Sequence, residues 1–308
     1  MQTIARGITY ADLHFLGKSR IIATAAIQSP GGVAVVDPGP STCLDTLRAA
    51  LGDQGIGIAD VRAILLTHIH LDHAGATGTL VRENPEIQVY VHERGARHMV
   101  DPAKLINSAT RLYGDDMDRL WGEFLPVPQE NIHALAGGER VHVADRALEV
   151  AYTPGHASHH VSYLDRESGV AFVGDTAGIR TGPDLFAMPP TPPPDIDIEV
   201  WKASAALIAD WQAETLFLTH FGPHGEPAAH MASLLEHLDD VADLARAIVE
   251  DERVSTADER VARFVAGIRG YLQRHMSDTA AALYDKAAPL DQCWLGLERY
   301  WKKQGVGA

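Results

Sequence analysis

Four short apolar runs, each followed within a few residues by His or Asp, dominate the hydrophobic pattern of this chain. An apolar run of strand length that ends in polar residues near a glycine predicts a buried strand leading into a loop. The runs occupy residues 63–66, 148–152, 170–173 and 215–218. A fifth run of the same kind, residues 33–36, ends at Asp37 and the turn signal Pro38-Gly39.

The polar residues after these runs have the chemistry of metal ligands. The first run leads into Thr67-His-Ile-His-Leu-Asp-His-Ala-Gly75, and the others lead to His156, Asp175 and His220. Imidazole nitrogens and carboxylate oxygens suit zinc or a similar divalent ion. If the strands are neighbours with aligned ends, seven side chains converge, which is too many for one tetrahedral ion and suits two ions sharing a carboxylate. The seven are His68, His70, Asp72, His73, His156, Asp175 and His220.

This ordered series resembles the metal motifs of the metallo-β-lactamase superfamily, over residues 1–225. The resemblance implies an α/β fold, a four-layer αβ/βα sandwich. Within the superfamily the full ligand set is most similar to glyoxalase II and related dinuclear hydrolases, whereas flavodiiron proteins carry Glu in place of His70. The resemblance also implies an assignment of ligands: one ion on His68, His70 and His156, the other on Asp72, His73 and His220, and Asp175 bridging them.

The chain from residue 226 onward has a different pattern and is predicted to be a helical region, residues 226–308. Apolar residues recur at three-and-four spacing between Met231 and Val249, which is typical of an amphipathic helix. Thr256-x-x-Glu259 is a capping-box pattern, and residues 290–301 suggest a last helix. Glyoxalase II-like enzymes append a helical region in the same place. Arg299 and Lys302 either contact an anionic substrate there or belong to a solvated charged face.

Two segments inside residues 1–225 leave two interpretations open. Residues 104–125 have mainly helical spacing, broken near Gly114, and either cap the site or form a packed helical hairpin. Residues 182–194 contain six prolines, which exclude a helix or a central strand. This proline-rich loop is either a wall of the substrate site or a rigid connector.

Several polar residues beside the motifs are candidates for supporting roles. Metal-bound imidazoles usually donate their other N–H to a carboxylate or carbonyl, and Asp37 is the best candidate for such an orienting group. Its alternative role is that of a turn residue. Thr67, Thr176 and Thr219 each neighbour a predicted ligand, and His159, His160 and His224 lie beside motifs without a settled role.

Composition narrows the class of partner and compartment. The formal net charge of −15 without a Lys/Arg cluster argues against nucleic acid and anionic membrane as partners, and favours a small-molecule substrate. Cys43 and Cys293 are too few for a disulfide framework. No signal-peptide pattern and no run of membrane-spanning length occur, so we expect a cytoplasmic protein, as a monomer or a homo-oligomer.

The expected chemistry is metal-dependent hydrolysis, because no Ser, Cys or Thr nucleophile motif is evident. A hydroxide bridging two divalent ions would attack an ester, thioester or lactone, with Asp72 orienting the nucleophile. Zinc is the favoured metal, and iron or manganese fit the same ligands. The alternatives are a mononuclear iron persulfide dioxygenase, which resembles the first motif, and a β-lactamase or phosphodiesterase using the same site.

Overall fold

The computed structural model describes residues 1–307 and divides the chain into two compact units. The first unit contains residues 1–152, 159–174 and 213–225, and the second contains residues 153–158, 175–212 and the chain from Glu226 onward. Each unit is therefore built from segments that are distant in sequence. The domain division expected above, 1–225 and 226–308, stays a prediction.

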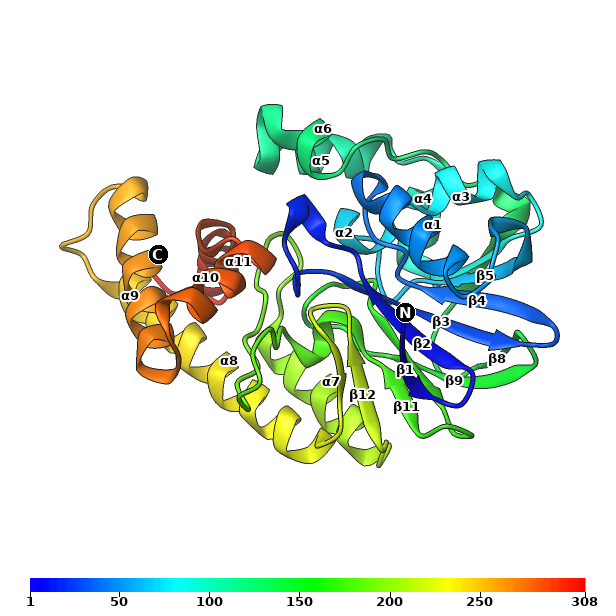
Figure 1. The fold of residues 1–308 in the computed structure, drawn as a ribbon. Helices are drawn as coiled ribbons and strands as arrows, with labels where there is room; N and C mark the ends of the chain where they lie inside the picture. Colours follow the sequence, from blue (N-terminus) through cyan, green and yellow to red (C-terminus); the bar gives the residue numbers. More distant parts are fainter. Residues whose placement is uncertain (308) are drawn as a thin grey trace. The chain divides into compact units, whose positions relative to one another are not determined.

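The first unit contains a mixed seven-stranded sheet whose strands lie in chain order (Figure 1). Neighbouring strands are antiparallel from the first to the fourth and parallel from the fourth to the seventh. The strands are β1 (Gln2–Ala5), β2 (Ile8–Asp12), β3 (Ala23–Ser29), β4 (Gly32–Val36), β5 (Val61–Leu65), β6 (Gln88–His92) and β7 (Ile132–Leu135).

A second sheet of six strands completes this unit, in the order β13-β12-β11-β10-β9-β8. β9, β11 and β12 run in the same direction, because β10 is antiparallel to both β9 and β11, and β12 is parallel to β11. Their carboxyl ends therefore share one edge of the sheet. The strands are β8 (Arg140–Val143), β9 (Arg146–Tyr152), β10 (Val161–Asp165), β11 (Val170–Phe172), β12 (Thr215–Leu218) and β13 (Gly222–His224).

The two sheets share one apolar core. Alternate residues of β3, β4 and β5 pack with residues of β9, β10, β11 and β12 in a single buried cluster. All five apolar runs of the sequence form strands, as predicted. They do not form one row, however, because residues 33–36 and 63–66 belong to the seven-stranded sheet and the other three runs to the six-stranded sheet.

The helices of the first unit connect strands of the seven-stranded sheet. Gly114 has a φ of 52°, a left-handed conformation that ends one helix before the next begins, so the predicted break in residues 104–125 is confirmed. The helices are α1 (Leu44–Gly52), α2 (Leu71–Ala74), α3 (Thr77–Glu83), α4 (Glu93–Val100), α5 (Ala103–Tyr113) and α6 (Met117–Leu120). Single 3-10 turns occupy Phe15–Gly17, Ser41–Cys43, Ile58–Asp60, Gly114–Asp116, Gln129–Asn131 and Gly174–Ala177.

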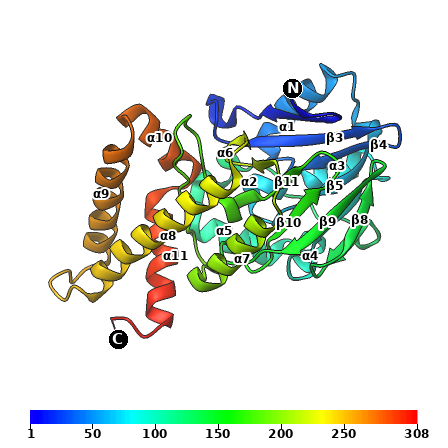
Figure 2. The same cartoon turned by 90° about the horizontal axis from the view of Figure 1, so that it is seen from below.

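The second unit is mainly helical. Thr256 and Glu259 form the predicted capping box at the start of α9, with hydrogen bonds of 3.2 and 3.3 Å. Within this unit α11 packs against both α8 and α9, and α7 packs against α8 (Figure 2). The helices are α7 (Ile198–Asp210), α8 (Pro227–Glu250), α9 (Ala257–His275), α10 (Asp278–Ala287) and α11 (Leu290–Lys303).

The proline-rich loop belongs to the core of the second unit. Phe186 and Met188 from this loop are buried in one cluster with Trp201 of α7 and with apolar residues of α8 to α11.

Among the described residues, no helix combines the length and the apolar character that crossing a membrane requires.

Candidate metal centre

A buried carboxylate, Asp37, organises the polar residues at the ends of β4, β5 and β12. Its Oδ1 accepts the backbone N–H of Thr67 at 2.8 Å. Its Oδ2 accepts the hydroxyls of Thr67 and Thr219, at 2.7 and 2.8 Å, and lies 2.8 Å from Nδ1 of His73. Asp37 is therefore the orienting group that the sequence analysis expected, and Thr67 and Thr219 act through it.

Asp72 faces two histidines of the same unit. Its Oδ2 lies 3.8 Å from Nε2 of His73 and 3.2 Å from Nε2 of His220. Both imidazoles are buried, while the Asp72 side chain keeps 19% of its surface exposed. The ligand atoms of Asp72, His73 and His220 all lie within 4.8 Å of one another, which is close enough for one ion to contact all three.

Hydrogen bonds fix the tautomers of both histidines. Nδ1 of His73 meets the Asp37 carboxylate, and Nδ1 of His220 meets the carbonyl oxygen of Ile21 at 2.6 Å. Since both partners are acceptors, each Nδ1 carries the proton and each Nε2 of a neutral ring presents a lone pair. Two lone pairs and a carboxylate oxygen then face one another, an arrangement that a divalent cation stabilises. The residues present therefore fit a metal ion.

His68 and His70 form a second pair of candidate ligand atoms in the first unit. Nε2 of His68 lies 2.9 Å from Nδ1 of His70. Nδ1 of His68 lies 3.2 Å from the hydroxyl of Thr67, which itself donates to Asp37. The Asp37 network thus also sets the orientation of His68.

Two histidines without a predicted role lie against this pair. The His160 ring stacks on the His68 ring, with an angle of 25° between the planes and 5.1 Å between the centroids. The centroid of the His159 ring lies 6.1 Å from that of His68. His159 also meets the edge of His70 at 5.6 Å. Four imidazoles are therefore packed together, and His159 and His160 restrict the positions of the two candidate ligands.

The second unit holds the other two predicted ligands, His156 and Asp175. Nε2 of His156 lies 3.4 Å from Oδ2 of Asp175, and Nδ1 lies 2.9 Å from the carbonyl oxygen of Pro190. This is the same pattern as in the first unit, because a carbonyl fixes the proton on Nδ1 and Nε2 is turned toward a carboxylate.

Helix α7 holds the backbone on both sides of this pair. The indole N–H of Trp201 donates to the carbonyl of Thr176 at 2.8 Å, and Ser204 donates to the carbonyl of Pro154 at 2.6 Å. Gly155 has a φ of 133°, and a Cβ there would come within 2.3 Å of Trp201. Only glycine permits this close approach of the loop to the helix.

A model of the metallo-beta-lactamase superfamily matches residues 20–220. The chain belongs to this superfamily. The matched stretch contains the seven predicted ligands in order, so the resemblance stated from the motifs is confirmed at the level of the family.

Curated relatives of this superfamily member are similar over part of their length. The chain is 31% identical over 156 residues to a hydroxyacylglutathione hydrolase of Trichodesmium erythraeum, covering 50% of this chain and 45% of that protein. It is 28% identical over 162 residues to the metallo-beta-lactamase fold-containing protein ST1585 of Sulfurisphaera tokodaii, covering 52% and 60%. The chain thus matches about half the length of these relatives.

Solved structures of the superfamily show the fold. A metallo-beta-lactamase family protein from Thermus thermophilus has a TM-score of 0.72 at 23% identity, covering 98% of this chain and 95% of that one. ST1585 has a TM-score of 0.64 at 21% identity, covering 94% and 98%. They confirm the predicted αβ/βα fold class, with helices at the carboxyl end of the chain.

One buried residue outside the predicted ligand set contacts the loop of Asp175. Nε2 of His230, on α8, donates to the carbonyl of Ala177 at 2.7 Å. Burial lowers the pKa of His230 to about 4, so this imidazole is neutral at physiological pH. No sequence motif marks this contact, because it joins a turn to a helix far along the chain.

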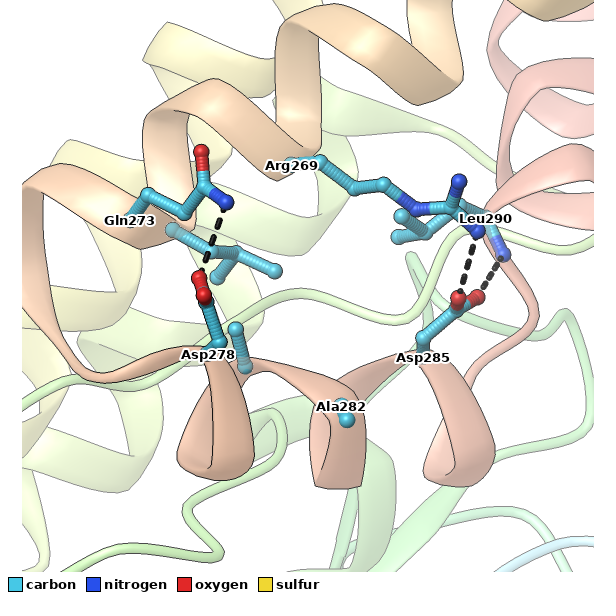
Figure 3. A pocket seen from close by; sticks show the side chains of 8 residues that line it. Arg269, Gln273, Asp278, Ala282, Asp285 and Leu290 are labelled. Atoms are coloured by element: carbon cyan, nitrogen blue, oxygen red, sulfur yellow. Dashed lines mark hydrogen bonds and ion pairs between the residues drawn. The ribbon is translucent and has the colours of Figure 1, made fainter.

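A cavity of about 300 Å³ in the second unit is a poor candidate for the metal centre (Figure 3). Its charged lining residues are already paired, since Arg269 lies 3.0 Å from Asp285 and Gln273 donates to Asp278 at 2.8 Å. Its lining contains no histidine or cysteine.

Neither cysteine of the chain is linked in a disulfide, and both Cys43 and Cys293 are buried, free thiols.

Proposed function

We propose that this protein is a dinuclear metal-dependent hydrolase that cleaves a thioester, or a related ester or lactone. The observation that carries the proposal is the set of Asp72, His73 and His220. Two Nε2 lone pairs and a carboxylate oxygen face one another there, and the hydrogen bonds of Asp37 and Ile21 keep them so.

Both units contain predicted ligands. Five predicted ligands belong to the first unit and two to the second. Histidines in each unit have the proton fixed on Nδ1 by an acceptor, which supports a shared role as ligands. The proposed assignment is one ion on His68, His70 and His156, a second on Asp72, His73 and His220, and Asp175 between the two.

The residues of the chain then have separate tasks in hydrolysis. Divalent ions, when bound, lower the pKa of a coordinated water toward about 7 and polarise a carbonyl oxygen. Asp72 is the proposed catalytic residue, because its carboxylate is partly exposed and can accept a hydrogen bond from the attacking water. Asp37 keeps His73 in one tautomer and orientation, and the carbonyl of Ile21 does the same for His220.

A thioester is the preferred substrate class. Two relatives that are 29% and 31% identical to this chain over the matched residues are named hydroxyacylglutathione hydrolase. A polyanionic phosphodiester such as nucleic acid is disfavoured by the net charge of −15, which repels it over most of the surface. Zinc is the proposed metal, since a His- and Asp-rich ligand set suits it.

A substrate panel combined with metal analysis tests this proposal. The zinc-loaded protein is assayed with a thioester, an ester, a lactone, a β-lactam and a phosphodiester, and compared with Asp72→Asn. A matched control is Asp45→Asn, because Asp45 is an acidic residue on α1 with a 96% exposed side chain. We expect thioester hydrolysis that Asp72→Asn abolishes and Asp45→Asn leaves unchanged. One bound iron with oxygen consumption on a persulfide would instead identify the dioxygenase and contradict the proposal.

A further inference from the structure

A groove between α9 and α10 contains charged and apolar side chains that the proposed metal centre does not use (Figure 3). All of its lining residues belong to the second unit. The volume of the cavity is about 300 Å³, at the lower end of the range for small-molecule sites. The groove is therefore large enough for a small ligand.

The middle of the groove is apolar. Ala281 and Ala282 line it from α10, and Leu272 lines it from α9. Leu272 and Leu290 are each 1% exposed, so they belong to the packed interior beneath the groove. An alanine methyl fills much less volume than a longer apolar side chain, which leaves the space between the two helices open.

Polar pairs lie at the two ends of the groove, with Ala282 between them, as Figure 3 shows. At one end the side-chain amide of Gln273 donates to the carboxylate of Asp278 at 2.8 Å. At the other end Arg269 lies 3.0 Å from Asp285. A ligand in the groove would therefore meet polar groups at its ends and methyl groups along its length.

Helical geometry determines the distance between the two ends. Four lining residues of α10 share one face of the helix, because they stand at positions i, i+3, i+4 and i+7. They are Asp278, Ala281, Ala282 and Asp285. A rise of about 1.5 Å per residue places the two aspartates about 10 Å apart along the helix axis. Only alanine side chains of α10 lie between them on this face.

The two ends differ in net charge. Arg269 compensates the carboxylate of Asp285, which also accepts the backbone N–H of Leu290 at 3.3 Å. Gln273 is neutral, and Asp278 forms no ion pair with any residue of the described chain, 1–307. The groove therefore carries one uncompensated negative charge, at the end where Asp278 lies. Charge complementarity favours a cation there, and the net charge of −15 attracts cations at long range.

The start of α10 fixes the position of the Asp278 carboxylate. Ser277 is the N-cap of this helix, and its hydroxyl accepts the backbone N–H of Ala280 at 3.3 Å. A carboxylate in the first turn is stabilised by the helix dipole. Gln273 donates to Oδ1, and within the part of the chain that the structure describes Oδ2 accepts no hydrogen bond. Oδ2 is therefore available to a donor from outside the chain.

We propose that this groove binds a primary aliphatic amine in its protonated form, with the ammonium on Asp278 and the alkyl chain between Ala282 and Leu272. An ammonium supplies the positive charge and the donors that the Asp278 carboxylate lacks, and the chain covers apolar surface. Such an amine is protonated at pH 7, because its pKa is close to that of the lysine side chain, about 10.4. The inference does not depend on the proposed hydrolytic function.

The first test compares three probes of equal chain length by NMR titration of the metal-loaded protein at pH 7. The probes are pentylammonium chloride, 1-pentanol and sodium pentanoate. We expect pentylammonium to bind about 5-fold more tightly than 1-pentanol, the range of a partly exposed ion pair, and pentanoate to bind least. The methyl signals of Ala281 and Ala282 should shift on binding, since these side chains line the groove.

The second test uses variants at the polar end and in the apolar middle. Asp278→Asn should weaken pentylammonium binding about 5-fold and leave 1-pentanol binding unchanged. Asp258→Asn is the control, because Asp258 is an exposed carboxylate in the first turn of α9. Ala282→Leu should weaken the binding of both probes by filling the groove, whereas Ala262→Leu, at an exposed position of α9, should not. Any binding of the amine to the metal ions is common to all of these proteins.

Ionic strength gives an independent measurement. Added salt should weaken pentylammonium binding more in the wild type than in Asp278→Asn, because it screens the ion pair. Equal affinity for pentylammonium and 1-pentanol would overturn the inference, as would equal effects of Asp278→Asn and Asp258→Asn. Shifts that do not saturate and spread over the acidic surface would show unspecific attraction and would also overturn it. If Ala282→Leu does not fold, the comparison of Asp278→Asn with Asp258→Asn decides, since both replace exposed side chains.

Discussion

At the scale of single residues, Asp37 is the buried carboxylate that links several residues of the candidate metal centre. It accepts four hydrogen bonds, from Thr67, Thr219 and His73. Its φ of 48° is a left-handed conformation that Asp and Asn tolerate better than most residues. Asp37→Asn therefore preserves the backbone and changes the charge and the acceptors.

We expect Asp37→Asn to weaken metal binding about 10- to 100-fold, because an amide cannot hold the His73 proton on Nδ1 as a carboxylate does. Competition with a metallochromic chelator measures this affinity. Asp165→Asn is the control, because Asp165 is also a buried carboxylate of the first unit but pairs with Arg146. Equal losses of metal affinity in both variants would show that Asp37 acts only through general stability.

His230 gives a prediction about pH. Its pKa is about 4 in the folded protein, and the ordinary value is 6.5. The unfolded chain therefore takes up a proton between pH 6.5 and pH 4 that the folded chain excludes. Above pH 6.5, His230 is neutral in both the folded and the unfolded chain and costs no stability. As the pH falls toward 4, the free energy of unfolding decreases by about 3 kcal/mol in total.

His230→Gln removes this titration and keeps an N–H donor for the carbonyl of Ala177. Urea unfolding of wild type and variant, measured from pH 7 to pH 4.5, checks the prediction. The free energy of unfolding should fall more steeply with decreasing pH in the wild type than in the variant. Parallel pH dependences would mean that His230 is not the group that takes up the proton.

At the scale of elements, the turn at Gly155 packs closely against α7 beside the predicted ligand His156. Gly155→Ala places a Cβ within 2.3 Å of Trp201 and forces alanine into a φ of 133°. We expect a loss of stability of about 2–5 kcal/mol and a lower metal content, because His156 is the next residue. Gly225→Ala is the control, since a Cβ there meets nothing within 4 Å, and it should change the free energy of unfolding by less than about 0.5 kcal/mol.

The elements also show how far the sequence determines the fold. Apolar runs predicted β4, β5, β9, β11 and β12, because the apolar pattern of a strand is local, and β4, β11 and β12 are buried on both faces. The assignment of these strands to two sheets was not predictable, since strand pairing joins distant residues. Helix α10 lies in the predicted helical region but was not singled out, because it buries mainly Tyr284 and shows little apolar periodicity.

In the candidate site, too, some features were predictable from the sequence and others were not. Ligand types were readable from the motifs, because His and Asp cluster directly after the strands. Asp37 was singled out from the position of a carboxylate at a strand end, and the structure shows the expected contact with a histidine, His73. The contact of His230 was not identified, because a single basic residue in a helix has no pattern, and only tertiary contacts show that its environment is unusual.

At the scale of the whole molecule, the net charge of −15 affects how an anionic substrate reaches the site. A chain of this charge repels anions at long range, so the positive charge of bound metal ions must act at short range. Salt screens the long-range repulsion more than the buried contact. Binding of an anionic substrate would thus depend on contacts within the site and not on long-range attraction.

The number of bound ions is the measurement that decides most about the proposed centre. Seven predicted ligand side chains exceed the needs of one ion, and we expect two divalent ions per chain by elemental analysis of the metal-saturated protein. Asp175→Ala should lower the occupancy of both metal ions, because the proposed bridging carboxylate contacts both. His220→Gln should lower the occupancy of one ion. Removal of metal with a chelator should lower the unfolding temperature, since only the folded chain assembles the ligands. Asp45→Asn should keep the full metal content, and a single ion at saturation that His220→Gln leaves unchanged would contradict the dinuclear assignment.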